Sequence, residues 1–207
     1  MKVAGKNEVI FIYNSFINNY SINIQETAFF NFEKKMKNIE ILEINEIGAY
    51  EEGLTLLLED SVNNGASIGF LAPIEMNQVV NYWREVNHKL SQGNCRLWIA
   101  IQDGKIVGSV QLSLVSKKNG VHRAEVEKLM VLTSARKQGI ATLLMSELEN
   151  FSREKGLRLL VLDTREGDVS ELLYSKIGFV RVGVIPSFAL SSNGNYDGTA
   201  IYYKKLV

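Results

Sequence analysis

Apolar residues recur along this chain with two different spacings. Intervals of three and four residues predict amphipathic helices at residues 49–63, over a stretch that starts at Pro73, at 140–151 and at 171–177. Alternating apolar residues, or short unbroken apolar runs, predict strands at residues 39–44, 97–101, 106–114, 125–131, 159–162 and 200–203. Strands and helices of this length in one chain indicate an α/β (α+β) fold.

Dipeptides that end in glycine mark the turns between the strands. Asp103-Gly104 and Asn119-Gly120 each predict a hairpin, so three antiparallel strands lead into the segment that ends at Val131. Pro73 is suited to the first turn of the second helix, and Asp168 with Glu171 predicts a capping box for the last helix. Asn193-Gly194 and Asp197-Gly198 lie in a final hairpin.

The loop at residues 136–141 is a candidate anion site. It reads R-x-x-G-x-A and joins a strand to an amphipathic helix, so backbone N–H groups and the positive end of the helix dipole meet there. Arg136 and Lys137 add full positive charges, Gly139 permits close backbone approach, and Ala141 keeps the next turn small. The loop alone could be an ordinary strand–helix turn, but its context favours a pyrophosphate site.

That context is a strand–helix–strand unit. The helix at 140–151 is followed by Gly156, a typical helix stop, and then by the apolar run Leu159–Leu162. We therefore expect the flanking strands to be parallel, with a right-handed crossover. The chain contains neither G-x-x-x-x-G-K-[ST] nor G-x-G-x-x-G, so neither a P-loop nor a dinucleotide-binding turn is indicated.

These residues resemble the GNAT superfamily of acyl-CoA-dependent N-acyltransferases. The segment 125–145 is similar to its motif A, with Leu129-Met130-Val131 as the apolar triplet before the loop, and residues 171–179 are similar to its motif B. Residues 183–186 and 202–204 resemble bacterial members related to tabtoxin-resistance acetyltransferases. The resemblance implies a mixed central sheet of about six to seven strands with a splayed parallel pair, and about four helices.

The resemblance also implies acetyl-CoA as cosubstrate, and we expect no metal. Main-chain groups of the strand before the loop would pair with pantetheine, the loop would hold the pyrophosphate, and one residue of the next strand would face the cofactor. The positions that this assigns to cofactor binding are Leu129, Met130, Val131, Arg136, Lys137, Gln138, Gly139, Ile140, Ala141, Thr142 and Thr164.

Three residues are candidates for proton transfer. The resemblance implies that Tyr174 protonates the departing thiolate, and that Glu125, at the position of the base in histone-type members, deprotonates the amine. Glu127 lies two residues from Glu125 and would share its face of the strand. Two structural explanations stay open: an exposed strand face for the glutamates, and packing in the helix for Tyr174. Other members of the superfamily use water chains as the base.

The acceptor would meet loops that vary freely in this fold. Phe70, in the loop between the first two helices, Asp163, at the end of a parallel strand, and Tyr196, in the last hairpin, are candidates for binding it.

Composition narrows the function classes. The 207 residues have a formal net charge of zero, which offers no broad basic field for nucleic acid or for a membrane. Two histidines and a single cysteine make a zinc site improbable, and the cysteine usage suits the cytoplasm. We divide the chain into an N-terminal extension at residues 1–37 and an acetyltransferase domain at 38–207. The apolar extension could contribute to a homodimer.

The hypothesis from the sequence is an N-acetyltransferase that acts on a primary amine of a small molecule. Two alternatives remain open. One is a protein acetyltransferase for N-terminal or lysine amines, which would need an open groove beside the loop at residues 65–72. The other is a non-catalytic acyl-CoA sensor. The sequence does not identify the acceptor.

Overall fold

The computed structural model describes residues 38–206, and the hypotheses about residues 1–37 lie outside them. A seven-stranded sheet runs through the described part in the order β1-β2-β3-β4-β5-β7-β6. Its strands are β1 Ile39–Ile44, β2 Cys95–Gln102, β3 Lys105–Leu114, β4 Arg123–Val131, β5 Leu159–Arg165, β6 Val180–Leu190 and β7 Tyr196–Lys205. The helices are α3 Glu51–Asn63, α4 Met76–Ser91, α5 Ile140–Glu154 and α6 Ser170–Lys176, with short 3₁₀ turns η1 at Gly48–Tyr50 and η2 at Thr133–Ala135.

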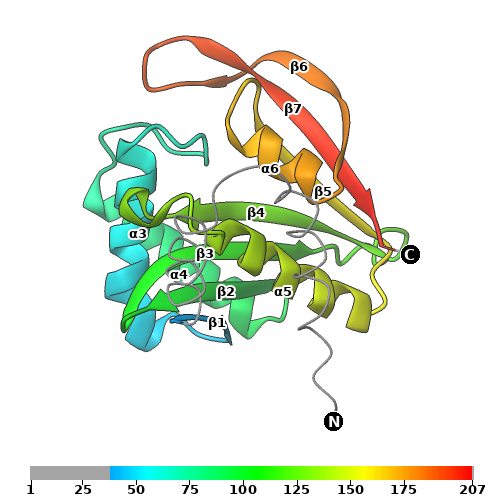
Figure 1. Cartoon of the computed structure of the whole chain (residues 1–207), viewed down its shortest axis with the longest axis horizontal. Coiled ribbons are helices and arrows are strands. Elements are labelled where there is room, and N and C mark those ends of the chain that lie inside the picture. The colour runs from blue at the N-terminus through cyan, green and yellow to red at the C-terminus, as the bar shows by residue number, and fades with distance from the viewer. Residues whose placement is uncertain (1–37, 207) are drawn as a thin grey trace, which may run out of the picture. The chain divides into compact units, whose positions relative to one another are not determined.

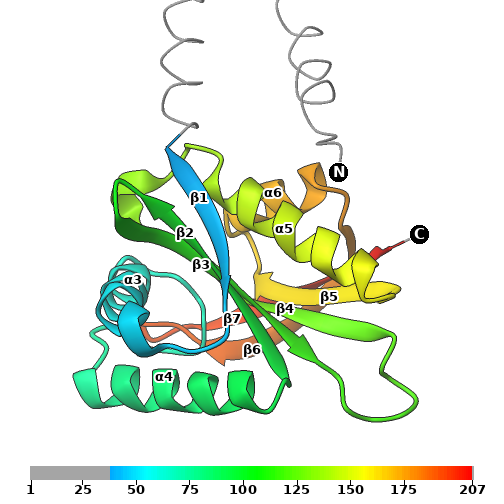
Figure 2. The same ribbon diagram turned by 90° about the horizontal axis from the view of Figure 1, so that it is seen from below.

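Helices cover both faces of this sheet. Figure 2 shows α3 and α4 on one side of the strands and α5 and α6 on the other. The stripes predicted from the sequence point inward: Leu54, Leu58 and Trp83 are buried in one core, and Ile140 and Leu148 in the other. The predicted α/β (α+β) fold is confirmed, including the number of strands and of helices.

β4 and β5 are the only parallel neighbours among the described strands. They pair only at their beginnings, where residues 123–125 face residues 159–161. Beyond this point β4 stays paired with β3, and β5 stays paired with β7 as far as Arg165. The two strands therefore separate toward their carboxyl ends, as Figure 1 shows, and the predicted splayed pair is present.

A β-bulge interrupts β4 beside this gap. Between the pairs Ser109–Met130 and Gln111–Glu127, β4 has one residue more than β3. Lys128 lies in the bulge with a left-handed φ of +52°. The extra residue reverses the alternation of side chains, so Met130 belongs to the core under α3 and α4 on the same face as Glu127.

Two predicted boundaries were wrong. α4 begins at Met76, not at Pro73, because Glu75 and Gln78 form a capping box that satisfies the N–H groups there. Asp197-Gly198 lies inside β7, and the turn of the last hairpin contains Gly194, whose N–H donates to the carbonyl of Ser191. In both cases a competing local hydrogen bond determines where the element starts.

No helix among residues 38–206 has the length and apolarity needed to cross a membrane.

Candidate functional site

The loop before α5 has the features of an anion site. Lys137 and Gly139 both adopt left-handed conformations, with φ of +61° and +81°. Gly139 is the N-cap of α5, provides no side-chain cap, and is followed by a first turn without Asp or Glu. The first N–H groups of a helix have no partner within it, so these groups are available to an anion at the positive end of the dipole.

Hydrogen bonds from neighbouring elements hold this loop in place. Asp60 of α3 accepts from the backbone N–H of Thr133 at 2.8 Å and from its hydroxyl at 3.0 Å. The Nε2 of Gln102 donates to Oε1 of Gln138 at 3.3 Å. Arg136 is exposed, and its Nε donates to the carbonyl of Val131 at 3.3 Å, so the guanidinium stays beside the end of β4.

A cavity of about 300 Å³ lies where β4 and β5 separate. Five residues of the predicted site line it: Glu127 and Leu129 from β4, Asp163 and Thr164 from β5, and Tyr174 from α6. The other lining residues are Ala66, Ser67, Ile68, Gly69, Val126, Lys128, Asp168, Ser170, Phe188, Ala189 and Thr199. Glu125, Phe70 and Tyr196 do not line it. The cavity therefore brings together one glutamate of the predicted pair, the tyrosine and an aspartate.

Tyr174 is held rigidly in the wall of this cavity. Its ring lies 5.9 Å from the ring centroid of Phe179 and 5.9 Å from that of Tyr202, and the side chain is buried. Burial, with the nearby carboxylates of Asp168 and Asp163, raises the pKa of the Tyr174 phenol. The phenol therefore stays protonated at any working pH and is available as a hydrogen-bond donor.

The junction between β5 and α6 determines where Tyr174 lies. The hydroxyls of Thr164 and Ser170 are hydrogen-bonded at 2.8 Å, and Asp168 accepts from the backbone N–H of Ser170 at 2.8 Å. Glu171 reaches back to the N–H of Gly167 at 2.6 Å rather than to that of Asp168, so the predicted capping box is replaced by this arrangement. The first turn of α6 is therefore tied to the end of β5.

Carboxylates surround the bulge of β4. The pKa of Glu125 is raised, mainly by partial desolvation and then by the negative charges of Glu127 and Asp163. Desolvation also raises the pKa of Asp163, against the attraction of Lys128. Glu127 faces Gln111 across the sheet, and the Nε2 of Gln111 donates to the hydroxyl of Tyr82 at 2.6 Å. The gap between the strands is thus acidic, which suits a cationic amine.

The raised pKa of Asp163 has a consequence for stability. Its pKa lies above the ordinary value of 3.8 in the folded protein, so the folded state binds this proton more readily than the unfolded chain. The free energy of unfolding therefore falls as the pH rises from the ordinary pKa of an aspartate through the raised pKa of Asp163. Asp163→Asn removes this pH-dependent loss of stability. We expect this variant to melt at a higher temperature at about pH 7.5, with the gain shrinking toward pH 4. A lower melting temperature at about pH 7.5 would contradict this account.

The loop between α3 and α4 forms a roof over the cavity. At one end the Arg165 guanidinium donates to the carbonyl of Gly65 at 3.1 Å, and at the other the N–H of Ala72 donates to the hydroxyl of Ser192 at 2.8 Å. Phe70 packs edge-on against Tyr82, with ring centroids 5.3 Å apart. The loop is therefore anchored to β5 and to the β6–β7 hairpin across the gap.

Two of the lining residues that sequence reasoning missed bear most on the chemistry of the cavity, Phe188 and Lys128. Phe188 of β6 lines it from a position that alternation along a strand does not distinguish from a surface residue. Lys128 lines it from the bulge. The signal for Lys128 was a break in period, because apolar residues at 124 and 126 are followed by a charge at 128 and not by another apolar residue.

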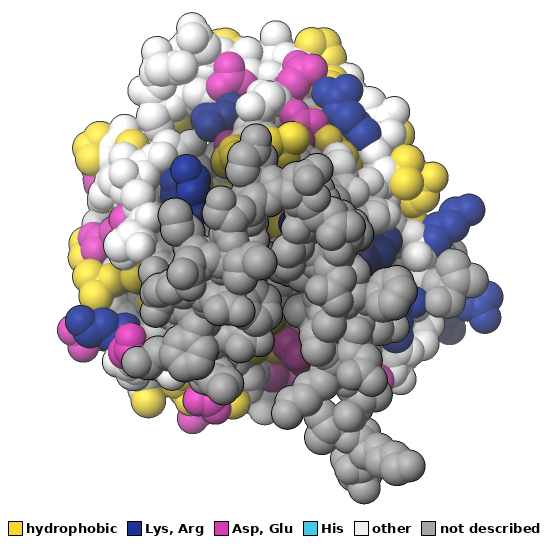
Figure 3. Space-filling model, viewed as in Figure 1, with side chains coloured by type: hydrophobic (Ala, Val, Ile, Leu, Met, Phe, Trp, Pro, Cys, Tyr) yellow, Lys and Arg dark blue, Asp and Glu magenta, His cyan; other side chains and the backbone are white. Residues whose placement is uncertain are grey.

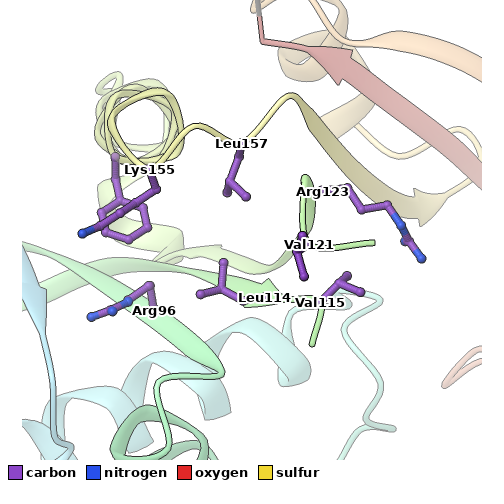
Figure 4. A pocket seen from close by; sticks show the side chains of 8 residues that line it. Arg96, Leu114, Val115, Val121, Arg123, Lys155 and Leu157 are labelled. Carbon is purple, nitrogen blue, oxygen red and sulfur yellow. The ribbon is translucent and has the colours of Figure 1, made fainter. Parts of the chain in front are cut away.

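A second cavity of about 300 Å³ lies at the other end of α5 (Figure 4). Its interior is apolar, and Arg96 and Lys155 lie over the ring of Phe151 at 5.4 and 5.6 Å. The head group of Arg123 points away from the cavity in Figure 4. No carboxylate, tyrosine or helix N-terminus lines it, so the cavity between β4 and β5 is the candidate active site.

Charges of both signs occur around the visible edge of the molecule in Figure 3, consistent with the formal net charge of zero. Among residues 38–206 no group of three or more His, Cys, Asp or Glu side chains is placed to hold a metal ion.

Comparison with known proteins agrees with this geometry. Residues 51–179 match the acetyltransferase (GNAT) family. An uncharacterized N-acetyltransferase from the hisH–hisA intergenic region of Azospirillum brasilense is 33% identical over 110 residues, which is 52% of this chain and 64% of that protein. The chain spans 41% to 64% of the length of the curated relatives that it matches.

Two solved structures have the same fold. The ribosomal-protein-alanine N-acetyltransferase of Brucella melitensis is 20% identical with a TM-score of 0.69, covering 80% of this chain and 99% of its own. The protein yncA of Salmonella typhimurium, solved with its cofactor acetyl-CoA, is 15% identical with a TM-score of 0.69, covering 82% and 95%. These comparisons do not show the resemblance to tabtoxin-resistance acetyltransferases. The matched residues include the loop before α5 and α6 with Tyr174, and the chain belongs to the acetyltransferase (GNAT) family.

Proposed function

We propose that this protein transfers the acetyl group of acetyl-CoA to a primary amine of a small molecule. The observation that carries the proposal is the cavity between the separated ends of β4 and β5, with Tyr174, Glu127 and Asp163 in its walls. The loop that follows β4 leads to the uncapped start of α5.

The chain fits acetyl-CoA in three respects. The uncapped N–H groups of α5, together with Arg136 and Lys137, suit the pyrophosphate. Beyond residue 125, the edge of β4 that faces β5 has no strand partner, so its main-chain groups are free to pair with pantetheine. When bound, acetyl-CoA supplies an activated acyl group as a thioester. The solved structure of yncA with acetyl-CoA supports this choice of cosubstrate.

Different residues of the cavity serve as the base and as the acid. Glu127 and Asp163 attract the cationic amine, and Glu127 accepts its proton directly or through water. The phenol of Tyr174 donates to the sulfur of the departing thiolate. The amine attacks the thioester carbon directly, and no cysteine lines the cavity to form an acyl-enzyme, because Cys95 is buried outside it. Backbone N–H groups at the bulge are suited to polarise the thioester carbonyl.

A small acceptor suits this cavity better than a protein. The roof at residues 65–72 is hydrogen-bonded at both ends, to Arg165 and to Ser192, so the acceptor side is covered. A cavity of about 300 Å³ lies at the lower end of the range typical of small-molecule sites. A protein N-terminus would have to enter beneath this roof.

The test is release of free thiol from acetyl-CoA over a panel of small amines and of N-terminal or lysine peptides, combined with calorimetry of acetyl-CoA. We expect acetyl-CoA to bind and small amines to be turned over. Turnover of peptides alone would favour a protein acetyltransferase. Tight binding without turnover of any acceptor would favour an acyl-CoA sensor and refute both enzyme functions.

A further inference from the structure

Lys128 is an unused cation inside the proposed active site. The mechanism above needs carboxylates and a phenol, yet this lysine lines the same cavity from the bulge of β4. Its backbone adopts a left-handed φ of +52°, which is uncommon for a residue other than glycine. A surface lysine would not require this conformation, so the bulge has the effect of directing a positive charge inward.

The ammonium of Lys128 has no partner. It makes no hydrogen bond and no ion pair within 4 Å to any residue in the described range 38–206, although Glu127 and Asp163 are near enough to affect it electrostatically. Desolvation lowers its pKa. A partly buried charge without a partner is unfavourable, and that cost is relieved when an anion binds.

The position of this ammonium indicates which anion it binds. A β-carbon placed on Gly69 would lie 3.6 Å from Nζ of Lys128, so the charge lies directly under the roof of the cavity. The roof covers the cavity that the proposed function assigns to the acceptor. Arg136 and Lys137 lie beyond the end of β4, where Arg136 is hydrogen-bonded to the carbonyl of Val131, and neither lines the cavity. The pyrophosphate is expected there. An anion held by Lys128 is therefore a part of the acceptor.

We propose that Lys128 binds a carboxylate of the acceptor, and that the substrates are α-amino acids or closely related amino carboxylates. This inference rests on the proposed function. Glu127 and Asp163 take the ammonium group, while Lys128 takes the carboxylate beside it, so the acceptor enters as a zwitterion. Ile68, Val126 and Phe188 offer an apolar wall to the side chain of the amino acid.

The experiment compares matched acceptors, each an L-amino acid with an apolar side chain against its own carboxamide, in the thiol-release assay. In the wild-type protein we expect kcat/KM to be at least about 10-fold higher for the free acid. Lys128→Met should lower kcat/KM for the acids about 10- to 100-fold, mostly through KM, and leave the carboxamides nearly unchanged. Lys128→Arg should restore part of the preference, because it keeps the charge. Lys118→Met removes an exposed lysine of the loop between β3 and β4, outside the cavity, and serves as the control.

Three results would overturn the inference: a wild-type preference for the carboxamides, an equal loss for acids and carboxamides in Lys128→Met, or a raised KM for acetyl-CoA in that variant. Calorimetry of the amino acids in the presence of coenzyme A separates this inference from the proposed function. If no acceptor is turned over but amino acids bind to the wild type and not to Lys128→Met, the proposed function fails and the carboxylate site stands. If they bind equally to both, the carboxylate site fails.

Discussion

Tyr174→Phe is expected to lower kcat for acetyl transfer by about 100-fold or more, with little change in the KM of either substrate. The variant removes only the phenol hydroxyl, which burial keeps protonated and which lines the cavity between β4 and β5. A donor that acts on the departing sulfur contributes to the transition state and not to ground-state binding, so the loss falls on kcat. Steady-state kinetics of thiol release measure it.

The ring packing of Tyr174 lets this variant remove the hydroxyl without disturbing the fold. Contacts with Phe179 and Tyr202 are kept by phenylalanine, and the hydroxyl has no hydrogen-bond partner among the described residues, so the free energy of unfolding should change by less than about 1 kcal/mol. Tyr203→Phe removes a hydroxyl from β7 outside the cavity and should leave kcat unchanged. Unchanged turnover in Tyr174→Phe would remove the tyrosine from the mechanism.

Gly139→Glu is expected to weaken acetyl-CoA binding by about 100-fold, close to 2.7 kcal/mol. It adds a negative charge beside the N–H groups that the uncapped start of α5 offers to the pyrophosphate. It also forces a side chain onto a φ of +81°, which costs about 1–2 kcal/mol of stability. Calorimetry of acetyl-CoA measures the first effect and thermal unfolding the second.

The other end of the same helix provides the control for this variant. Gly156 also adopts a left-handed φ, of +74°, and a β-carbon there would meet no atom within 4 Å. Gly156→Glu therefore introduces the same strain and the same charge far from the loop. It should lose at least as much stability, because its charge opposes the helix dipole, yet bind acetyl-CoA as the wild type does. If both variants bind acetyl-CoA equally, the loop before α5 does not hold the pyrophosphate.

The elements of the fold could be predicted because their signals are local. The stripe of Ile140, Leu144 and Leu148 requires only the 3.6-residue period of a helix, and all three are buried as expected. Asp103 and Gly104 both adopt a positive φ, because the favoured turn of a two-residue hairpin requires this conformation at both positions. The wrong start of α4 also has a local cause, since Pro73 and the Glu75–Gln78 capping box are both helix-start signals and the capping box prevails.

The candidate site was only partly predictable because its geometry depends on contacts between distant segments. The sequence placed Glu125 and Glu127 on the same face of one strand, but which of them borders a cavity depends on where β5 separates from β4. Phe70 was expected at the acceptor. In the structure it packs on Tyr82, and the residues that line the cavity from that loop are its neighbours at 66–69.

By itself the sequence predicted most of the elements in their order, with β6 the exception, and the candidate anion loop at residues 136–141, because each depends on the nearest residues along the chain. Tyr174 was assigned through the family resemblance. The tertiary structure alone decided three further features. They are the bulge that turns Lys128 inward, the set of residues that line the gap between β4 and β5, and the roof tied to Arg165 and Ser192, which lie 100 and 120 residues from their partners. Pairing register and long-range hydrogen bonds exist only once the strands have met, so no local pattern of residues encodes them.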